Sequence, residues 1–122
     1  MALPRSKLAF LTLPRYSMIA LSNAVEPLRM ANILTRQPVY DWSIVSLDGQ
    51  PTPASNGLEL SPTLPLEQAG NVDILFVCGG VDVQDAVSPK VLAALKRLAE
   101  RRVPLGGLCT GGYALAKAGL LD

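Results

Sequence analysis

Apolar residues gather in short segments of the chain, and their spacing predicts four strands. Residues 7–13, 72–78 and 103–108 are apolar almost throughout, which is typical of strands buried on both faces of a parallel sheet. Residues 40–47 alternate between apolar and polar positions and are rich in aromatic and β-branched side chains, so we expect another strand there.

Three helices are expected between and after these strands. Ser17 can cap a helix over residues 18–34, whose apolar positions recur at helical spacing. Ser88 can cap a second helix over residues 89–102, with a proline at its first position, and a third helix begins at residue 111. Strands that alternate with helices predict an α/β fold: a doubly wound, mostly parallel sheet with helices on both faces.

The composition fits one folded domain over residues 1–122, because 49% of the residues are apolar. The net charge of +1 gives this chain no basic footprint for nucleic acid. Two cysteines far apart, with no apolar run long enough for a signal peptide, favour a reducing cytoplasm. No segment approaches the roughly 20 apolar residues of a membrane span, so we expect no membrane association.

The turn after the last predicted strand carries the clearest candidate chemistry. Residues 107–111, Gly-Leu-Cys-Thr-Gly, have the form of a nucleophile elbow with cysteine in place of serine. Such a turn lifts Cys109 above the end of its strand, towards the edge where ligands bind in parallel α/β sheets. The alternative is that Cys109 is a small buried core residue, as free cysteines usually are. The flanking glycines favour a cysteine that lines a pocket.

Two further positions are candidates for the same site. Gly79 and Gly80 follow a buried strand and would let backbone N–H groups approach a carboxylate or an oxyanion, although a plain turn would also use them. Glu26 lies on a largely apolar helix, where it could hydrogen-bond the sulfur of Cys109 or simply pair with Arg29 at the surface. The spacing alone does not choose between these alternatives.

The chain contains no histidine, which limits the chemistry open to Cys109. A Cys–His pair, a histidine acid or base, and nearly every common zinc site are therefore excluded within these residues. We expect neither a metal nor a cofactor. An enzyme would have to use Glu26 as the partner that cycles a proton with the thiol of Cys109.

Several motifs together resemble a known family. The elbow at residues 107–111, the segment 78–83 and especially residues 24–32 look like the PfpI-like domain of GlxA-type, AraC-family transcriptional regulators. Residues 54–58 fit the same pattern. The wider superfamily, which is related to class I glutamine amidotransferases, shares the elbow but not the helix segment 24–32.

The resemblance implies a flavodoxin-like fold, a sensor of small nitrogenous metabolites such as amino acids or quaternary amines, and a homodimer. By position, Glu26 and Cys109 match the acid and cysteine of enzymatic relatives. Gly79, Gly80 and Thr110 match the cradle around them. Regulators of this family generally use the pocket for binding rather than for turnover.

The family's sensor domain normally continues beyond the elbow helix and is followed by a helix-turn-helix DNA-binding domain. This chain stops at Asp122. We therefore expect it to be truncated after the elbow helix, to contact DNA only through a C-terminal domain outside these residues, and to leave an open sheet edge that favours association. The alternative is a PfpI-like enzyme, of hydrolase, hydratase or glyoxalase type, that uses Cys109 and Glu26.

Overall fold

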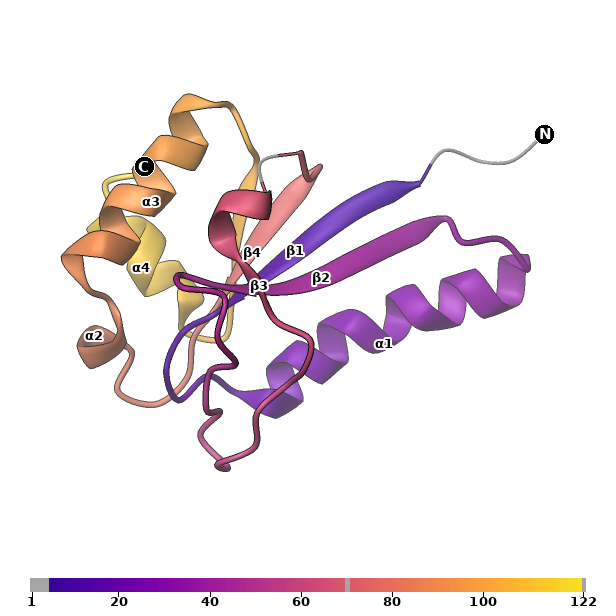
Figure 1. Cartoon of the computed structure of the whole chain (residues 1–122), viewed down its shortest axis with the longest axis horizontal. Helices are drawn as coiled ribbons and strands as arrows, with labels where there is room; N and C mark the ends of the chain where they lie inside the picture. Colours follow the sequence, from indigo (N-terminus) through magenta and orange to yellow (C-terminus); the bar gives the residue numbers. More distant parts are fainter. Residues whose placement is uncertain (1–4, 70, 122) are drawn as a thin grey trace.

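The fold is an α/β sheet of five parallel strands in the order β3-β2-β1-β4-β5 (Figure 1). It is seen in a computed structural model that describes residues 5–69 and 71–121, so the ends of the predicted domain and residue 70 lie outside the described residues. The strands are β1 (Ser6–Thr12), β2 (Tyr40–Ser46), β3 (Leu64–Pro65), β4 (Ile74–Cys78) and β5 (Leu105–Leu108). The helices are α1 (Met18–Thr35), α2 (Val83–Ala86), α3 (Pro89–Glu100) and α4 (Gly111–Lys117), with a 3-10 helix η1 at Leu66–Ala69.

The four predicted strands are confirmed, and all of their pairings are parallel. β3 adds a fifth strand of two residues beside β2, which no periodicity could have indicated. The strand predicted from Val103 begins only at Leu105. The N–H of Val103 donates to the carbonyl of Leu98, and Pro104 has no N–H to donate, so these two residues close helix α3 instead.

Both serine caps are confirmed. The side chain of Ser17 accepts a hydrogen bond from the N–H of Ala20 at 3.2 Å, and that of Ser88 accepts one from Val91 at 3.2 Å. The predicted helix over residues 89–102 ends at Glu100, because Arg102 has a φ of 64° and leaves the helical region. No described helix is long and apolar enough to cross a bilayer.

Successive residues of the strands point to opposite faces of the sheet, and each face has its own apolar cluster. Ala9 and Leu11 of β1 join the larger cluster, which packs against α3, α4 and η1. Phe10, between them, joins a smaller cluster that packs against α1. The prediction of helices on both faces is therefore confirmed, and the carboxyl ends of the strands lie where α1 and α4 begin.

Candidate functional site

Cys109 occupies a nucleophile elbow between β5 and α4. Its φ of 54° lies in the left-handed region, which costs energy for a residue other than glycine and is typical of functional turns. Its side chain is exposed, so the alternative of a buried core cysteine is wrong for this residue. Cys78 is the buried cysteine, and burial raises the pKa of its thiol to about 12.

The glycines around Cys109 make this turn possible. A Cβ on Gly111 would overlap the carbonyl oxygen of Val77, and one on Gly107 would lie 2.5 Å from the backbone nitrogen of Gly112. Side chains at these two positions would push α4 away from the sheet. The glycines thus hold the start of α4 against β4 and present Cys109 at the surface.

Gly79, Gly80, Cys109 and Thr110 lie together at the carboxyl ends of β4 and β5, and we call this group the elbow cradle. The hydroxyl of Thr110 donates to the carbonyl of Gly80 at 2.7 Å. The N–H of Gly79 donates to the carbonyl of Leu108 at 3.2 Å, so this N–H is not free to bind an oxyanion as the sequence suggested. The structure brings together four of the five predicted site residues.

An ion pair that the sequence analysis missed lies beside the cradle. Nη1 of Arg15 and Oδ2 of Asp82 are 2.6 Å apart, and both side chains are at least half exposed. The carbonyl of Arg15 packs against Gly80, and Asp82 follows Gly80 by two residues, so the pair sits at the mouth of the cradle. Both residues have positive φ values, 64° and 55°, which no spacing in the sequence reveals.

Glu26 lies elsewhere on the molecule. Its carboxylate accepts a hydrogen bond from Nε of Arg29, one turn along α1, and both side chains are half exposed. This is the surface pairing that the sequence left open as an alternative. The N–H of Ser17 donates to the carbonyl of Gly79 beside the cradle, and Glu26 follows nine residues later, about 13 Å along the helix axis. The structure therefore does not bring Glu26 to Cys109.

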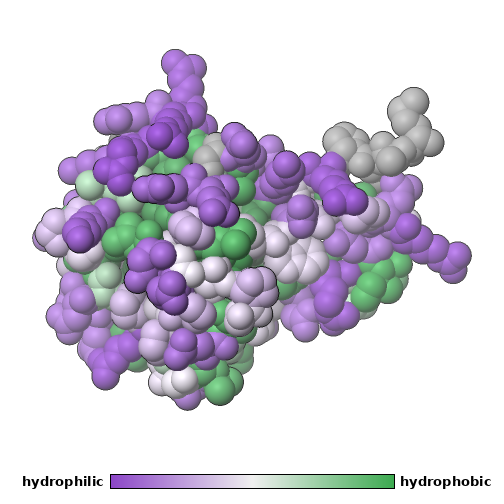
Figure 2. Space-filling view, viewed as in Figure 1, coloured by the Kyte–Doolittle hydropathy of each residue, from purple (hydrophilic) through white to green (hydrophobic). Residues whose placement is uncertain are grey.

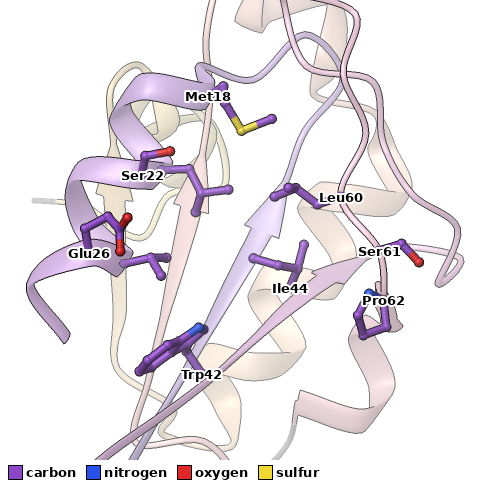
Figure 3. Close-up of a pocket in the computed structure, with 10 residues that line it drawn as sticks. Met18, Ser22, Glu26, Trp42, Ile44, Leu60, Ser61 and Pro62 are labelled. Atoms are coloured by element: carbon purple, nitrogen blue, oxygen red, sulfur yellow. The ribbon is translucent and has the colours of Figure 1, made fainter. Parts of the chain in front are cut away.

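Glu26 instead borders a groove between α1, β2 and residues 60–62. In Figure 3, Met18, Ser22 and Glu26 lie on one side and Leu60, Ser61 and Pro62 on the other, with Trp42 and Ile44 between them. The groove has a volume of about 410 Å³ and mostly apolar walls. No residue of the elbow cradle lines it. The structure leaves Trp42 half-buried in this groove.

The polar groups near the cradle are poor candidates for acid–base chemistry. Among the described residues, no hydrogen bond involves the sulfur of Cys109, and no cluster of acidic, cysteine or histidine side chains could hold a metal ion. Tyr16 is buried, and its hydroxyl has no hydrogen-bond partner. Burial, and then the nearby Cys78 and Glu59, raise the pKa of Tyr16, which keeps the phenol neutral.

Comparison with known proteins shows that this chain is similar to transcriptional regulators. The chain is 44% identical over 115 residues to the HTH-type transcriptional regulator GbdR of Pseudomonas aeruginosa, and 32% identical over 118 residues to the HTH-type transcriptional regulator GlxA of Rhizobium meliloti. These matches cover 94% and 95% of this chain but 31% and 36% of the relatives, so the chain spans about a third of their length.

A solved structure extends the likeness to three dimensions. The crystal structure of an AraC family transcriptional regulator from Pseudomonas putida superposes with a TM-score of 0.84 at 33% identity, covering 96% of this chain and 63% of that one. An isonitrile hydratase of Pseudomonas putida is 27% identical over 117 residues, which cover 95% of this chain and 49% of the enzyme. The model of the DJ-1/PfpI family matches residues 10–122. The chain belongs to the DJ-1/PfpI family.

Proposed function

We propose that this chain is the effector-sensing part of an AraC-family transcriptional regulator and that its effector is a small nitrogenous metabolite of the amino acid or quaternary amine type. The observation that carries the proposal is the 44% identity to a protein named as an HTH-type regulator, across 94% of this chain. Binding of the effector would control DNA binding by a helix-turn-helix domain that lies outside these residues, in the cytoplasm.

We place the effector at the elbow cradle. Gly79, Gly80, Cys109 and Thr110 form its floor, and the exposed Arg15–Asp82 pair lies at its mouth. A zwitterionic amino acid carries one charge for each member of this pair: its carboxylate suits the guanidinium and its ammonium suits the carboxylate. A quaternary amine would use Asp82 alone. The site thus offers charge complementarity to the proposed effector class.

Binding is a better account of this site than catalysis. A general base must lie within about 2.6–3.2 Å of the proton it takes, or reach it through one water. Glu26 is about 13 Å along α1 from the cradle, and the chain has no histidine. A cysteine-dependent enzyme is the second candidate, supported by the exposed Cys109 in its elbow and by the likeness to an isonitrile hydratase.

Titration calorimetry of the whole chain with free amino acids and trimethylated amines tests the proposal. We expect at least one of them to bind, and Asp82→Asn to weaken that binding about tenfold or more, because a charge-assisted contact is lost. Asp41→Asn is the matched control, since Asp41 is an exposed carboxylate near the amino end of β2, at the opposite edge of the sheet. Equal loss in both variants, or no binding by any compound, would contradict the proposal.

Two further variants separate the alternatives. Cys109→Ser should preserve effector binding under the sensor proposal. An enzyme would instead be supported if the chain hydrates an isonitrile, or turns over an amide or methylglyoxal, and this activity disappears in Cys109→Ser. Glu26→Gln should leave binding unchanged if the effector lies in the cradle. Weaker binding in Glu26→Gln would instead place the effector in the groove beside Trp42.

A further inference from the structure

We propose that a hollow between α3 and η1, on the face of the sheet opposite α1, binds a carboxylate with an apolar body, such as an arylacetate or a medium-chain fatty acid. We call it the α3 groove: residues of α3 and η1 line it, together with Leu47 and Arg101, and its volume is about 320 Å³. This second site goes beyond the proposed sensor function, because it shares no residue with the elbow cradle or with the groove beside Trp42.

The floor of the α3 groove is apolar and its shape is set by the core. Leu66 of η1 and both Ala94 and Leu98 of α3 line the groove and are buried members of the main apolar cluster. Leu47, directly after β2, also lines it and is 37% exposed. A preformed hollow of this size suits the apolar part of a small molecule, since ligand pockets usually have volumes of about 300–1,000 Å³.

Two arginines lie along one side of this floor. Arg97 and Arg101 are one turn apart on the same side of the helix, and both line the groove. Neither forms an ion pair with another residue in the part of the chain that the structure describes. Two cations at this spacing repel each other, and one anion bound between them would relieve the repulsion.

The helix dipole does not by itself account for the position of this pair. The dipole favours cations near the last turn of a helix, but it does so on every side of the helix. Both arginines lie instead on the side that borders the buried Ala94 and Leu98. In Figure 2, hydrophilic side chains gather over α3 at the upper left of the view, and hydrophobic atoms are visible in the gaps between them. The surface thus offers charge and apolar area side by side.

The balance of charge in the α3 groove favours a single carboxylate. Glu67 of η1 also lines the groove, so the two arginines and this one carboxylate leave a net charge of +1. A monoanion neutralises that charge, whereas a phosphate monoester, with a charge of about −2, would leave an excess of negative charge beside Glu67. The two oxygens of a carboxylate also match the paired N–H donors of a guanidinium group.

Titration calorimetry of the whole chain with phenylacetate and octanoate tests the proposal. We expect saturable binding with a dissociation constant below about 1 mM. Phenylacetamide keeps the apolar body without the charge, and acetate keeps the charge without the body. Each should bind at least about tenfold more weakly, because each loses one of the two contacts. Equal binding of acetate and phenylacetate, or no saturable binding of either phenylacetate or octanoate, overturns the proposal.

Three variants of α3 and its C-terminal end test the arginines. Arg97→Gln and Arg101→Gln should each weaken the binding of phenylacetate about tenfold, because a charge-assisted hydrogen bond is lost. Lys96→Gln is the matched control, since Lys96 is an exposed cation of the same helix that does not line the groove. All three side chains are exposed, so the variants should fold, and far-UV circular dichroism checks this. Equal weakening in all three would reduce the effect to net charge and overturn the proposal.

Amide chemical shifts distinguish the α3 groove from the elbow cradle, whose Arg15 is also a cation at a binding surface. Phenylacetate should shift the amides of α3 and η1. Shifts confined to residues 79–82 and 109–111 would place phenylacetate at the cradle and overturn the α3 groove. The sensor proposal depends instead on amino acids and trimethylated amines and on Asp82→Asn, so each proposal can fail while the other stands.

Discussion

The two faces of the sheet differ in how completely the described residues cover them. On one face, 17 buried residues from the strands, α3, α4 and η1 form the main apolar cluster. On the other face, five residues are buried, and ten more are only partly buried, among them Trp42 and Phe76 of the sheet and Val25 of α1. The difference assigns separate roles: the first face stabilises the fold, and the second is left able to interact.

The same contrast appears in the helices. On α3, Val91, Leu95 and Leu98 are buried and the polar residues face outward, as in any helix that packs on a sheet. On α1, Leu21 is the one fully buried residue, and large aliphatic side chains face outward. A single helix that is apolar on both sides lies between two partners. The sheet is one of these partners, and the outer side of α1 is uncovered by the described residues.

Leu95→Ala is the substitution with the largest expected effect. The side chain of Leu95 is fully buried in the main cluster, so its removal should lower the free energy of unfolding by about 3 kcal/mol, through lost transfer energy and a cavity. Ile19→Ala, on the open face, should change the stability of the monomer by less than about 0.5 kcal/mol. Urea unfolding measures both. A similar loss in the two variants would contradict the contrast between the faces.

Gly111→Ala tests how the elbow packs against the main apolar cluster, and it should lower the free energy of unfolding by about 2 kcal/mol. The new methyl group would collide with the carbonyl of Val77, and α4 would have to move. Gly112→Ala is the neighbouring control, because nothing lies within 4 Å of its Cβ position and alanine favours the helix. Thermal unfolding should therefore show a lower midpoint for the first variant and an equal or higher one for the second.

The pH dependence of stability tests how well the smaller cluster excludes water. Cys78 belongs to that cluster, and burial raises the pKa of its thiol from 9.0 to about 12. Below pH 9 both states keep the proton, so stability does not change. Above pH 9 the unfolded state releases it, and stability should fall by about 1.4 kcal/mol per pH unit until about pH 12.

Cys78→Ala should remove the onset of this loss near pH 9, as denaturant unfolding at several pH values would measure. A further loss at higher pH is expected to remain, because the pKa of Tyr16 is raised in the same cluster. An unchanged onset in Cys78→Ala would mean that water reaches this face of the sheet more freely than the structure indicates.

Most of the fold could be predicted because its signals are local. Apolar runs such as residues 72–78 and caps such as Ser88 are properties of a few neighbouring residues. The elbow could also be predicted, since the glycines that allow it flank Cys109. The two-residue strand β3 and the early end of α3 depend on partners far away in the sequence, so no local pattern could reveal them.

The site was harder to predict than the fold, because parts of it depend on residues that are far apart in the sequence. The elbow cradle was predicted because parallel strands end at one edge of the sheet. The Arg15–Asp82 pair joins two loops 67 residues apart in the sequence, and only the folded chain brings the two side chains together. The spacing left Glu26 open between Cys109 and surface pairing with Arg29, and the resemblance favoured a place beside Cys109. The helix carries it along α1 instead, towards the groove.

Hydrogen exchange of the backbone amides, measured by mass spectrometry, tests the contrast between the two faces most directly. The account predicts that amides of α3 and α4 exchange more slowly than those of α1, which buries a single residue fully. Equal protection of α1 and of the two other helices, or slower exchange in α1, would contradict it.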